Sequence, residues 1–177
     1  MASASFSESS GLRAFDTEGF FGMAKKTLYM ETTEVPASKT AAEVSAELIK
    51  AGATQIATSY ADGKVVGLRW TMKVNGIDAL FEMPARVDPV YEIFRKRTRN
   101  PNWLSDREKD SLRAKAERVA WRQLLRWVQA QCALIDTEMV QPMEVFTAYW
   151  IPPGQEQTLF DSIISKQFKA LPPAREQ

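Results

Sequence analysis

The chain has 177 residues, with 23 Lys and Arg against 22 Asp and Glu, one Cys and no His. This length favours one domain, and a composition of 45% hydrophobic and 25% charged residues excludes a chain that is disordered throughout. The lack of His and the single Cys exclude a disulfide framework, a structural zinc site and a Ser-His-Asp or Cys-His catalytic centre. No apolar run is long enough to span a membrane and no secretory signal is evident, so we expect a soluble, cytoplasmic protein.

Residues 1–26 differ in composition from the rest of the chain, and their large apolar residues are four phenylalanines (Phe6, Phe15, Phe20 and Phe21). We expect a disordered tail here. Two alternatives are that translation starts at Met23, and that the phenylalanines form a peptide that docks on a partner. A single domain is expected over residues 27–171, followed by a short tail over 172–177.

The alternation of Leu28, Met30 and Thr32 with polar residues predicts a short strand that ends before Pro36. Thr40 and Glu43 have the spacing of a capping box, which predicts that a helix begins there. That helix is expected to end at Gly52, a residue suited to the left-handed position after a helix.

The clearest β signal is the alternation of apolar and polar residues over 66–74, with Val66 facing inward and Val65 outward. Asn75-Gly76 predicts a type I′ hairpin turn after it. The two-residue loop fixes the register, with Val74 opposite Ile77, Met72 opposite Ala79, Trp70 opposite Phe81 and Leu68 opposite Met83.

A preceding hairpin is expected at Asp62-Gly63, where it joins a strand containing Ile56, Thr58 and Tyr60. A two-residue loop would here place inward residues opposite outward ones. We therefore predict a loop with an odd number of residues, three in the simplest case, with Gly63 in the left-handed conformation.

The second half of the chain is predicted to be helical. Asp88 and Pro89 mark one helix start, and a capping box of Ser105 and Glu108 begins a long helix that runs to about Asp136. A helical turn is expected from Pro142 and a final amphipathic helix from Leu159. The apolar stripe of the long helix is assigned to Ala120, Leu124, Trp127, Val128, Gln131, Leu134 and Ile135.

These elements predict an α+β fold: a β-α-β-β-β unit whose three- or four-stranded, mostly antiparallel sheet packs against the long helix, with short helices around it. Across that interface we expect contacts of Trp70, Met72, Phe81 and Met83 with Leu124, Trp127, Val128 and Ile135.

Positive charge is concentrated between Arg86 and Arg126, where 12 basic residues stand against 6 acidic ones. Cations neutralise phosphates and neighbouring aromatic rings stack on unpaired bases, so this region predicts a surface for single-stranded DNA or RNA. The candidate binding residues are Arg95, Lys96, Arg97, Arg99, Trp103, Lys115, Arg118, Trp121, Arg122 and Arg126. The alternative for the long-helix cations is an ordinary solvated helix face.

Other functions have less support in the sequence. An enzyme is the least supported class, because no catalytic constellation, cofactor motif or metal-ligand spacing is present, and Cys132 is expected at the edge of the core. Lys73 and Arg69 are expected to pair across strands with Asp78 and Glu82. The alternative function is a non-enzymatic homo-oligomeric interaction module that assembles through a sheet face, a sheet edge or the C-terminal helix.

The long helix also carries the motif Trp-Arg-x-Leu-x-x-Trp-Val-x-Ala-Gln over residues 121–131. With the meander that ends in Phe81-Glu82-Met83-Pro84, it resembles a group of small uncharacterised bacteriophage and prophage proteins, roughly from Thr27 to Leu159. No activity of that group assigns a role to any residue here. The resemblance implies a phage or mobile-element product in a bacterial host cell, where accessory proteins that handle nucleic acid are common.

Overall fold

The computed structural model describes residues 27–165, and the expected tails, the alternative start at Met23 and the last residues of the final predicted helix lie outside this range. The described chain has the predicted α+β class. Its elements are α1 (Ala37–Lys50), β1 (Ala53–Ala61), β2 (Lys64–Val74), β3 (Ile77–Pro84), α2 (Val87–Arg97), α3 (Asp106–Asp136), α4 (Pro142–Phe146), the 3-10 turn η2 (Thr147–Tyr149), β4 (Trp150–Ile151) and α5 (Leu159–Ser165).

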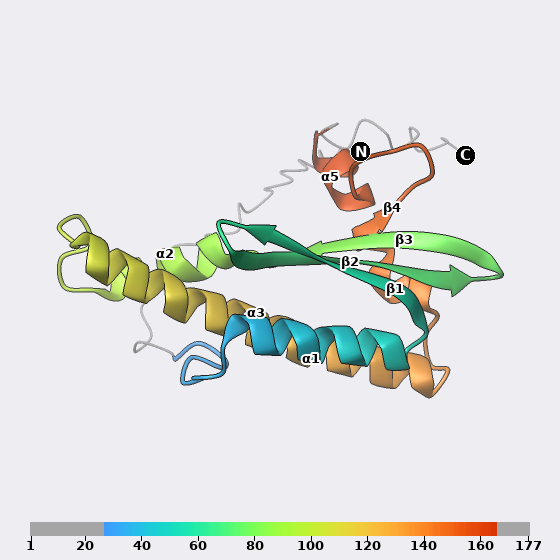
Figure 1. Cartoon of the computed structure of the whole chain (residues 1–177), viewed down its shortest axis with the longest axis horizontal. Coiled ribbons are helices and arrows are strands. Elements are labelled where there is room, and N and C mark those ends of the chain that lie inside the picture. Colours follow the sequence, from blue (N-terminus) through green and yellow to red (C-terminus); the bar gives the residue numbers. More distant parts are fainter. Residues whose placement is uncertain (1–26, 166–177) are drawn as a thin grey trace, which may run out of the picture.

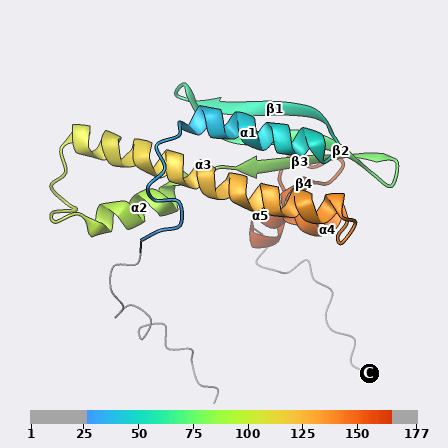
Figure 2. The same ribbon diagram turned by 90° about the horizontal axis from the view of Figure 1, so that it is seen from below.

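The sheet and the two longest helices form two layers (Figure 1). The sheet is antiparallel with the strand order β1-β2-β3-β4, and α1 and α3 lie side by side across one of its faces (Figure 2). α5 lies on the opposite side of the sheet, and α2 packs beside the first half of α3, beyond the end of the sheet. Within residues 27–165, no helix combines the length and apolar character needed to cross a membrane.

The hairpin between β2 and β3 has the predicted register. Asn75 and Gly76 both have positive φ, 51° and 80°, as a type I′ turn requires. Val74 therefore faces Ile77, and Trp70 faces Phe81 on the buried side of the sheet. Turn chemistry and hydrophobic alternation select the same register, which is why the sequence predicted it correctly.

The hairpin between β1 and β2 differs from the prediction. Its loop has two residues, Asp62 and Gly63, because Ala61 pairs with Lys64. The change of parity comes instead from a β-bulge: Ser59 pairs with Gly67 and Tyr60 with Val65, so that Val66 is the extra residue. The prediction of an odd loop was wrong, and Val65 is buried while Val66 is exposed.

The predicted strand over 28–32 is absent. The segment forms two turns, in which the N–H of Glu31 donates to the Leu28 carbonyl at 3.0 Å and that of Thr33 to the Met30 carbonyl at 3.1 Å. Met30 has φ +62°, which an extended strand does not allow. The fourth strand of the sheet is supplied by β4, which pairs with β3.

Two predicted helix starts are displaced, and the three at Ser105, Pro142 and Leu159 are confirmed. α1 begins at Ala37, so Thr40 is buried inside the helix, where its hydroxyl donates to the Pro36 carbonyl at 3.3 Å instead of forming a capping box. α2 begins at Val87, before the predicted cap. The capping box of Ser105 and Glu108 at the start of α3 is present. Gly52 follows Ala51, the C-cap residue of α1, and has the predicted left-handed conformation with φ +99°.

The core lies between the sheet and the α1–α3 layer. The rings of Trp70 and Phe81 stack with 5.4 Å between centroids, and Phe146 meets both edge-on. The buried face of α3 is rotated from the predicted stripe and shares Ala120 and Val128 with it, because α3 packs against α1 as well as the sheet. Leu124, Trp127 and Ile135 are half-buried at the margin of the core, and the fully buried face consists of Ala116, Val119, Ala120, Trp121, Leu125, Val128 and Cys132.

Candidate nucleic-acid interface

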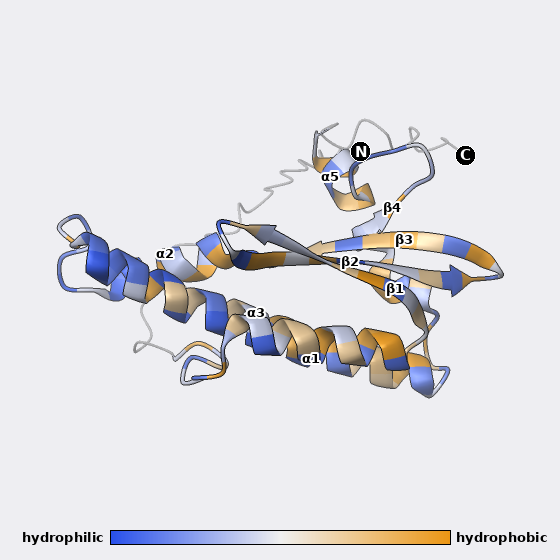
Figure 3. Cartoon of the chain, viewed as in Figure 1, coloured by the Kyte–Doolittle hydropathy of each residue, from blue (hydrophilic) through white to orange (hydrophobic). Residues whose placement is uncertain are grey.

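The α2–α3 hairpin projects beyond the sheet, and we call residues 96–108 at its far end the tip (Figure 1). The hairpin has a hydrophobic cluster of its own, in which Val90 and Phe94 of α2 pack with Ala116 and Val119 of α3. The Ser105 capping box fixes the first turn of α3 at the tip. Figure 3 shows that the first turns of α3 are strongly hydrophilic. The tip is therefore a polar surface held by packed helices.

Trp103 is the most exposed large apolar residue of the described chain, with 88% of its surface accessible. Its backbone N–H donates to the Asn100 carbonyl at 3.2 Å, which holds the turn that carries it. The indole lines a hollow of about 370 Å³ together with Arg99 and Leu104. A ring in this position is available to stack on a planar ligand group.

Two of the predicted cations at the tip are available to a ligand. Lys96 and Arg99 are exposed, and neither forms an ion pair with any residue in the range 27–165. Arg95 differs from them because its guanidinium binds Glu92 at 2.8 Å, and this hydrogen bond lowers the pKa of the Glu92 carboxyl. The predicted run of four cations is thus reduced by internal pairing.

Arg97 and Lys115 both bind Glu31 in the segment that precedes α1. The Glu31 carboxylate lies 2.9 Å from the Arg97 guanidinium and 3.5 Å from the Lys115 amine. It also accepts the Leu28 N–H at 2.7 Å, and that bond, followed by the Arg97 and Lys115 interactions, lowers the pKa of Glu31 against the opposing effect of partial burial. Lys115 in addition lies 4.7 Å from the Phe94 ring. These two cations attach residues 28–31 to the hairpin.

The long-helix cations continue this pattern toward α1. Arg118 donates to the Thr33 carbonyl at 3.4 Å and lies 3.7 Å from the Glu34 carboxylate. Arg122 forms a 2.6 Å ion pair with Glu43 of α1, and its side chain is 19% exposed. Arg126 is exposed and binds Gln129 on its own helix. Internal ion pairs therefore interrupt the predicted track of cations. The sequence analysis considered a nucleic-acid surface and a solvated helix face, and neither included ion pairs between distant parts of the chain.

Trp121 does not belong to the surface. It is fully buried in the main core, where its indole N–H donates to the Val65 carbonyl at 3.2 Å. The prediction that Trp121 stacks on bases is wrong for this reason. The bulge in β2 accounts for the contact, since it turns Val65 toward the helices.

The predicted cross-strand ion pairs and the single cysteine contribute to the folded structure and form no candidate site. Lys73 pairs with Asp78 and Arg69 with Glu82 across β2 and β3, as expected. Cys132 is buried, and burial, followed by the charge of Asp136, raises the pKa of its thiol to about 11. A thiol with this pKa is almost entirely protonated near neutral pH, which makes it a poor nucleophile.

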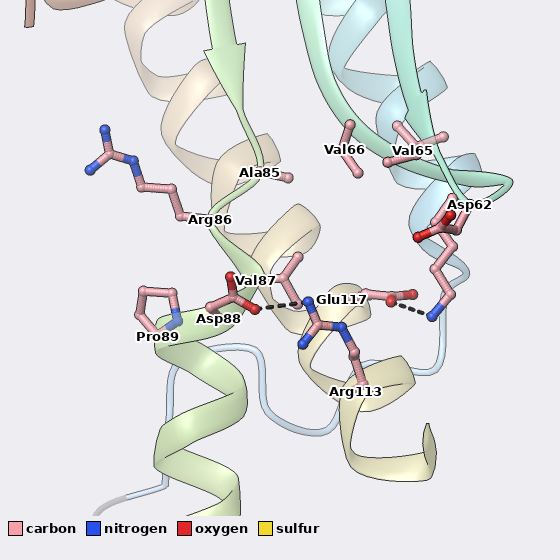
Figure 4. Close-up of a pocket in the computed structure, with 12 residues that line it drawn as sticks. Asp62, Val65, Val66, Ala85, Arg86, Val87, Asp88, Pro89, Arg113 and Glu117 are labelled. Atoms are coloured by element: carbon pink, nitrogen blue, oxygen red, sulfur yellow. Dashed lines mark hydrogen bonds and ion pairs between the residues drawn. The ribbon is translucent and has the colours of Figure 1, made fainter. Parts of the chain in front are cut away.

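A second hollow of about 610 Å³ lies between the β1–β2 hairpin, the start of α2 and α3 (Figure 4). Four of its charged residues form ion pairs: Lys64 with Glu117 at 2.7 Å, and Arg113 with Asp88 at 2.8 Å. Arg86 points away from Asp88 and lies 4.9 Å from the Phe160 ring of α5. The two lining residues that form no ion pair within residues 27–165, Asp62 and Arg86, have opposite charges, whereas Lys96 and Arg99 of the tip are both cations.

Arg107 is a tip residue that the sequence analysis missed. It is exposed in the first turn of α3 and forms no ion pair within the described part of the chain. Its position within the predicted capping box of Ser105 and Glu108, four residues after Trp103, was the available signal.

Comparison with known proteins adds no relative to this description. No family model matches the chain, and no match was found among curated proteins or among solved structures.

Proposed function

We propose that the tip binds single-stranded nucleic acid, with Trp103 stacking on a base and Lys96 and Arg99 contacting phosphates. The observation that carries the proposal is an 88% exposed indole that lines one hollow with Arg99, a cation that has no ion-pair partner in residues 27–165. Lys96, in the last turn of α2, is a second exposed cation without such a partner in this range. A Trp side chain is highly buried in most proteins, so an indole this exposed is the unusual part of the arrangement. Arg107 is positioned to extend the contact.

Single strands fit this surface better than a duplex does. A base can stack on an indole only when it is unstacked from its neighbours, and single strands present such bases without the cost of opening a helix. Five of the other predicted cations bind carboxylates of this chain and are excluded from the proposed contact: Arg95, Arg97, Lys115, Arg118 and Arg122. The proposed interface is therefore small, and we expect weak, salt-dependent binding.

The test is fluorescence anisotropy with labelled single-stranded and duplex oligonucleotides at two salt concentrations. We expect the single strand to bind more tightly. Trp103→Ala should weaken its binding by the value of one stacked base, about 1–3 kcal/mol or roughly 5- to 150-fold. Changing both Lys96 and Arg99 to Ser should reduce the salt slope by about 1.4, which is about 0.7 for each phosphate contact.

The matched control changes two exposed lysines of α1, Lys39 and Lys50, to Ser, which removes the same charge elsewhere on the surface. This control should keep most of the affinity and most of the salt slope. Absence of binding at low salt, or equal losses in the control and in the tip variants, would refute the proposal.

A further inference from the structure

Strand β1 forms one edge of the sheet, with β2 as its neighbour on one side. In Figure 2 it lies along the outer side of α1, and no described element covers its other side. An edge of this kind presents unpaired backbone N–H and C=O groups to solvent. Proteins usually protect such an edge with charged residues or Pro, yet the nine residues of β1 (Ala-Thr-Gln-Ile-Ala-Thr-Ser-Tyr-Ala) include neither.

Most of β1 is regular enough to pair with another strand. Its own irregularity lies at the start, where Ala53 and Gln55 pair with consecutive residues of β2 and Thr54 is extra. The extra residue at the other end of this ladder belongs to β2, not to β1. Residues Gln55–Ala61 therefore form a continuous stretch of seven residues, and Thr58 is its centre.

A shallow apolar surface adjoins this edge on the helix side of the sheet. A hollow of about 300 Å³ lies between β1 and α1, lined by Ala42, Ala46 and Ile49 of α1 and by Thr58 and Tyr60 of β1. Ile49 and Tyr60 are 59% and 65% exposed, high values for residues of their type. A strand added to β1 would lie beside Tyr60 and next to this hollow.

We propose that the partner is a second copy of this chain, and that the two β1 strands pair antiparallel about a two-fold axis at Thr58. A two-fold axis requires a self-complementary surface, and this register provides one. Thr58 faces Thr58 of the other copy, and Ile56 faces its Tyr60, in two symmetric pairs. Thr–Thr and aromatic–β-branched pairs are favourable across strands.

The same register avoids the usual penalties of edge pairing. No charged residue of β1 is buried, and no like charges of the two strands are brought together. Each exposed Tyr60 gains an apolar neighbour, and the two sheets become one sheet of eight strands. The proposal is independent of the tip, which lies at the far end of the α2–α3 hairpin.

The first test is the mass of the full chain in solution, measured by sedimentation or light scattering at micromolar concentration. We expect about 40 kDa, twice the 20.0 kDa of one chain. Thr58→Lys places like charges on the axis and should weaken dimerisation roughly tenfold or more. Thr32→Lys, at an exposed turn outside the sheet, is the matched control and should remain dimeric.

Mixing separates a broken interface from a broken fold. Thr58→Asp alone should weaken dimerisation in the same way, and an equal mixture with Thr58→Lys should restore the dimer because opposite charges then meet on the axis. A 20 kDa wild type, or a Thr58→Lys variant that dimerises as well as the control, would overturn the proposal.

Crosslinking tests the register. Thr58→Cys brings two sulfurs within disulfide reach, because facing Cα atoms in an antiparallel pair are about 4.5–5.5 Å apart. In Tyr60→Cys the two cysteines are four residues out of register, about 13 Å apart, and should not crosslink. The native Cys132 is buried and should not interfere. Crosslinking at position 60 in place of 58 would refute this register.

Discussion

The Glu31→Gln substitution tests whether cations between Arg86 and Arg126 stabilise the fold by pairing with carboxylates of the same chain. Glu31 lies in the turns that precede α1, and its carboxylate binds the Leu28 N–H, Arg97 of α2 and Lys115 of α3. Glutamine keeps the size and one acceptor oxygen but removes the charge. The change should therefore loosen the attachment of residues 28–34 to the hairpin while leaving the main core intact.

The expected loss of stability follows from the geometry. Two close hydrogen bonds, of 2.7 Å and 2.9 Å, involve the charged carboxylate, and the side chain is 18% exposed. Hydrogen bonds to charged groups contribute about 1.5–3 kcal/mol each when well buried, and exposed ion pairs about 0–1 kcal/mol. Because the substituted glutamine would retain one acceptor and water reaches this site, we expect a loss of about 1–2 kcal/mol.

The effect should depend on pH in one direction. The pKa of Glu31 is lower in the folded protein than in the unfolded chain, so folding favours the ionised form. The stabilisation is complete above the ordinary carboxyl pKa of about 4.3 and is lost as the pH falls through the lower folded value. The difference between wild type and Glu31→Gln should therefore be constant near pH 7 and shrink below about pH 4.

Urea unfolding at pH 7 and in steps below pH 5 measures both quantities. Glu156→Gln, which removes the same charge from an exposed loop, is the control and should change stability by less than about 0.5 kcal/mol. If Glu31→Gln matched this control, or if its effect grew at low pH, the assignment of Arg97 and Lys115 to an internal ion-pair site would be refuted.

Phe81→Ala should cost about 3–5 kcal/mol in urea unfolding, because Phe81 is fully buried between Trp70 and Phe146; a loss below about 1 kcal/mol would contradict the described core. Cys132 should react with a thiol reagent far more slowly in the folded protein than in urea, since it is buried and its pKa is raised to about 11. Equal rates of modification in the folded and unfolded states would exclude the buried placement. Because the pKa of this thiol is higher in the folded protein, the unfolded chain loses the thiol proton first, and the free energy of unfolding should fall as the pH rises from about 9 to 11.

Features that depend on a few adjacent residues were predictable. The Asn75-Gly76 turn and the capping box of Ser105 and Glu108 are local arrangements, and they occur where the sequence placed them. The thermodynamic preference of each is contained in its own segment. Longer-range competition explains the failures: Thr40 has the spacing of a cap, but the helix already begins at Ala37, where packing of α1 on the sheet extends it.

The candidate site shows the same division. The distribution of charge along the sequence identified the basic region and Trp103, and of these residues Lys96, Arg99 and Trp103 are exposed at the tip. Which cations are available could not be read from the sequence, because the partners of Lys115 and Arg122 (Glu31 and Glu43) lie about eighty residues earlier in the chain. Such pairs become neighbours only after folding.

By itself the sequence determined the α+β class, the register of β2 with β3 and the extent of α3, because hydrophobic period, turn residues and caps act over a few residues and agree with one another. Tertiary structure alone decided that Val65 rather than Val66 enters the core, that Trp121 is buried, and that the uncharged strand β1 lies at the edge of the sheet. These outcomes depend on how strands and helices that are distant in the chain share one core, and neither residue type nor spacing specifies that arrangement before the layers pack.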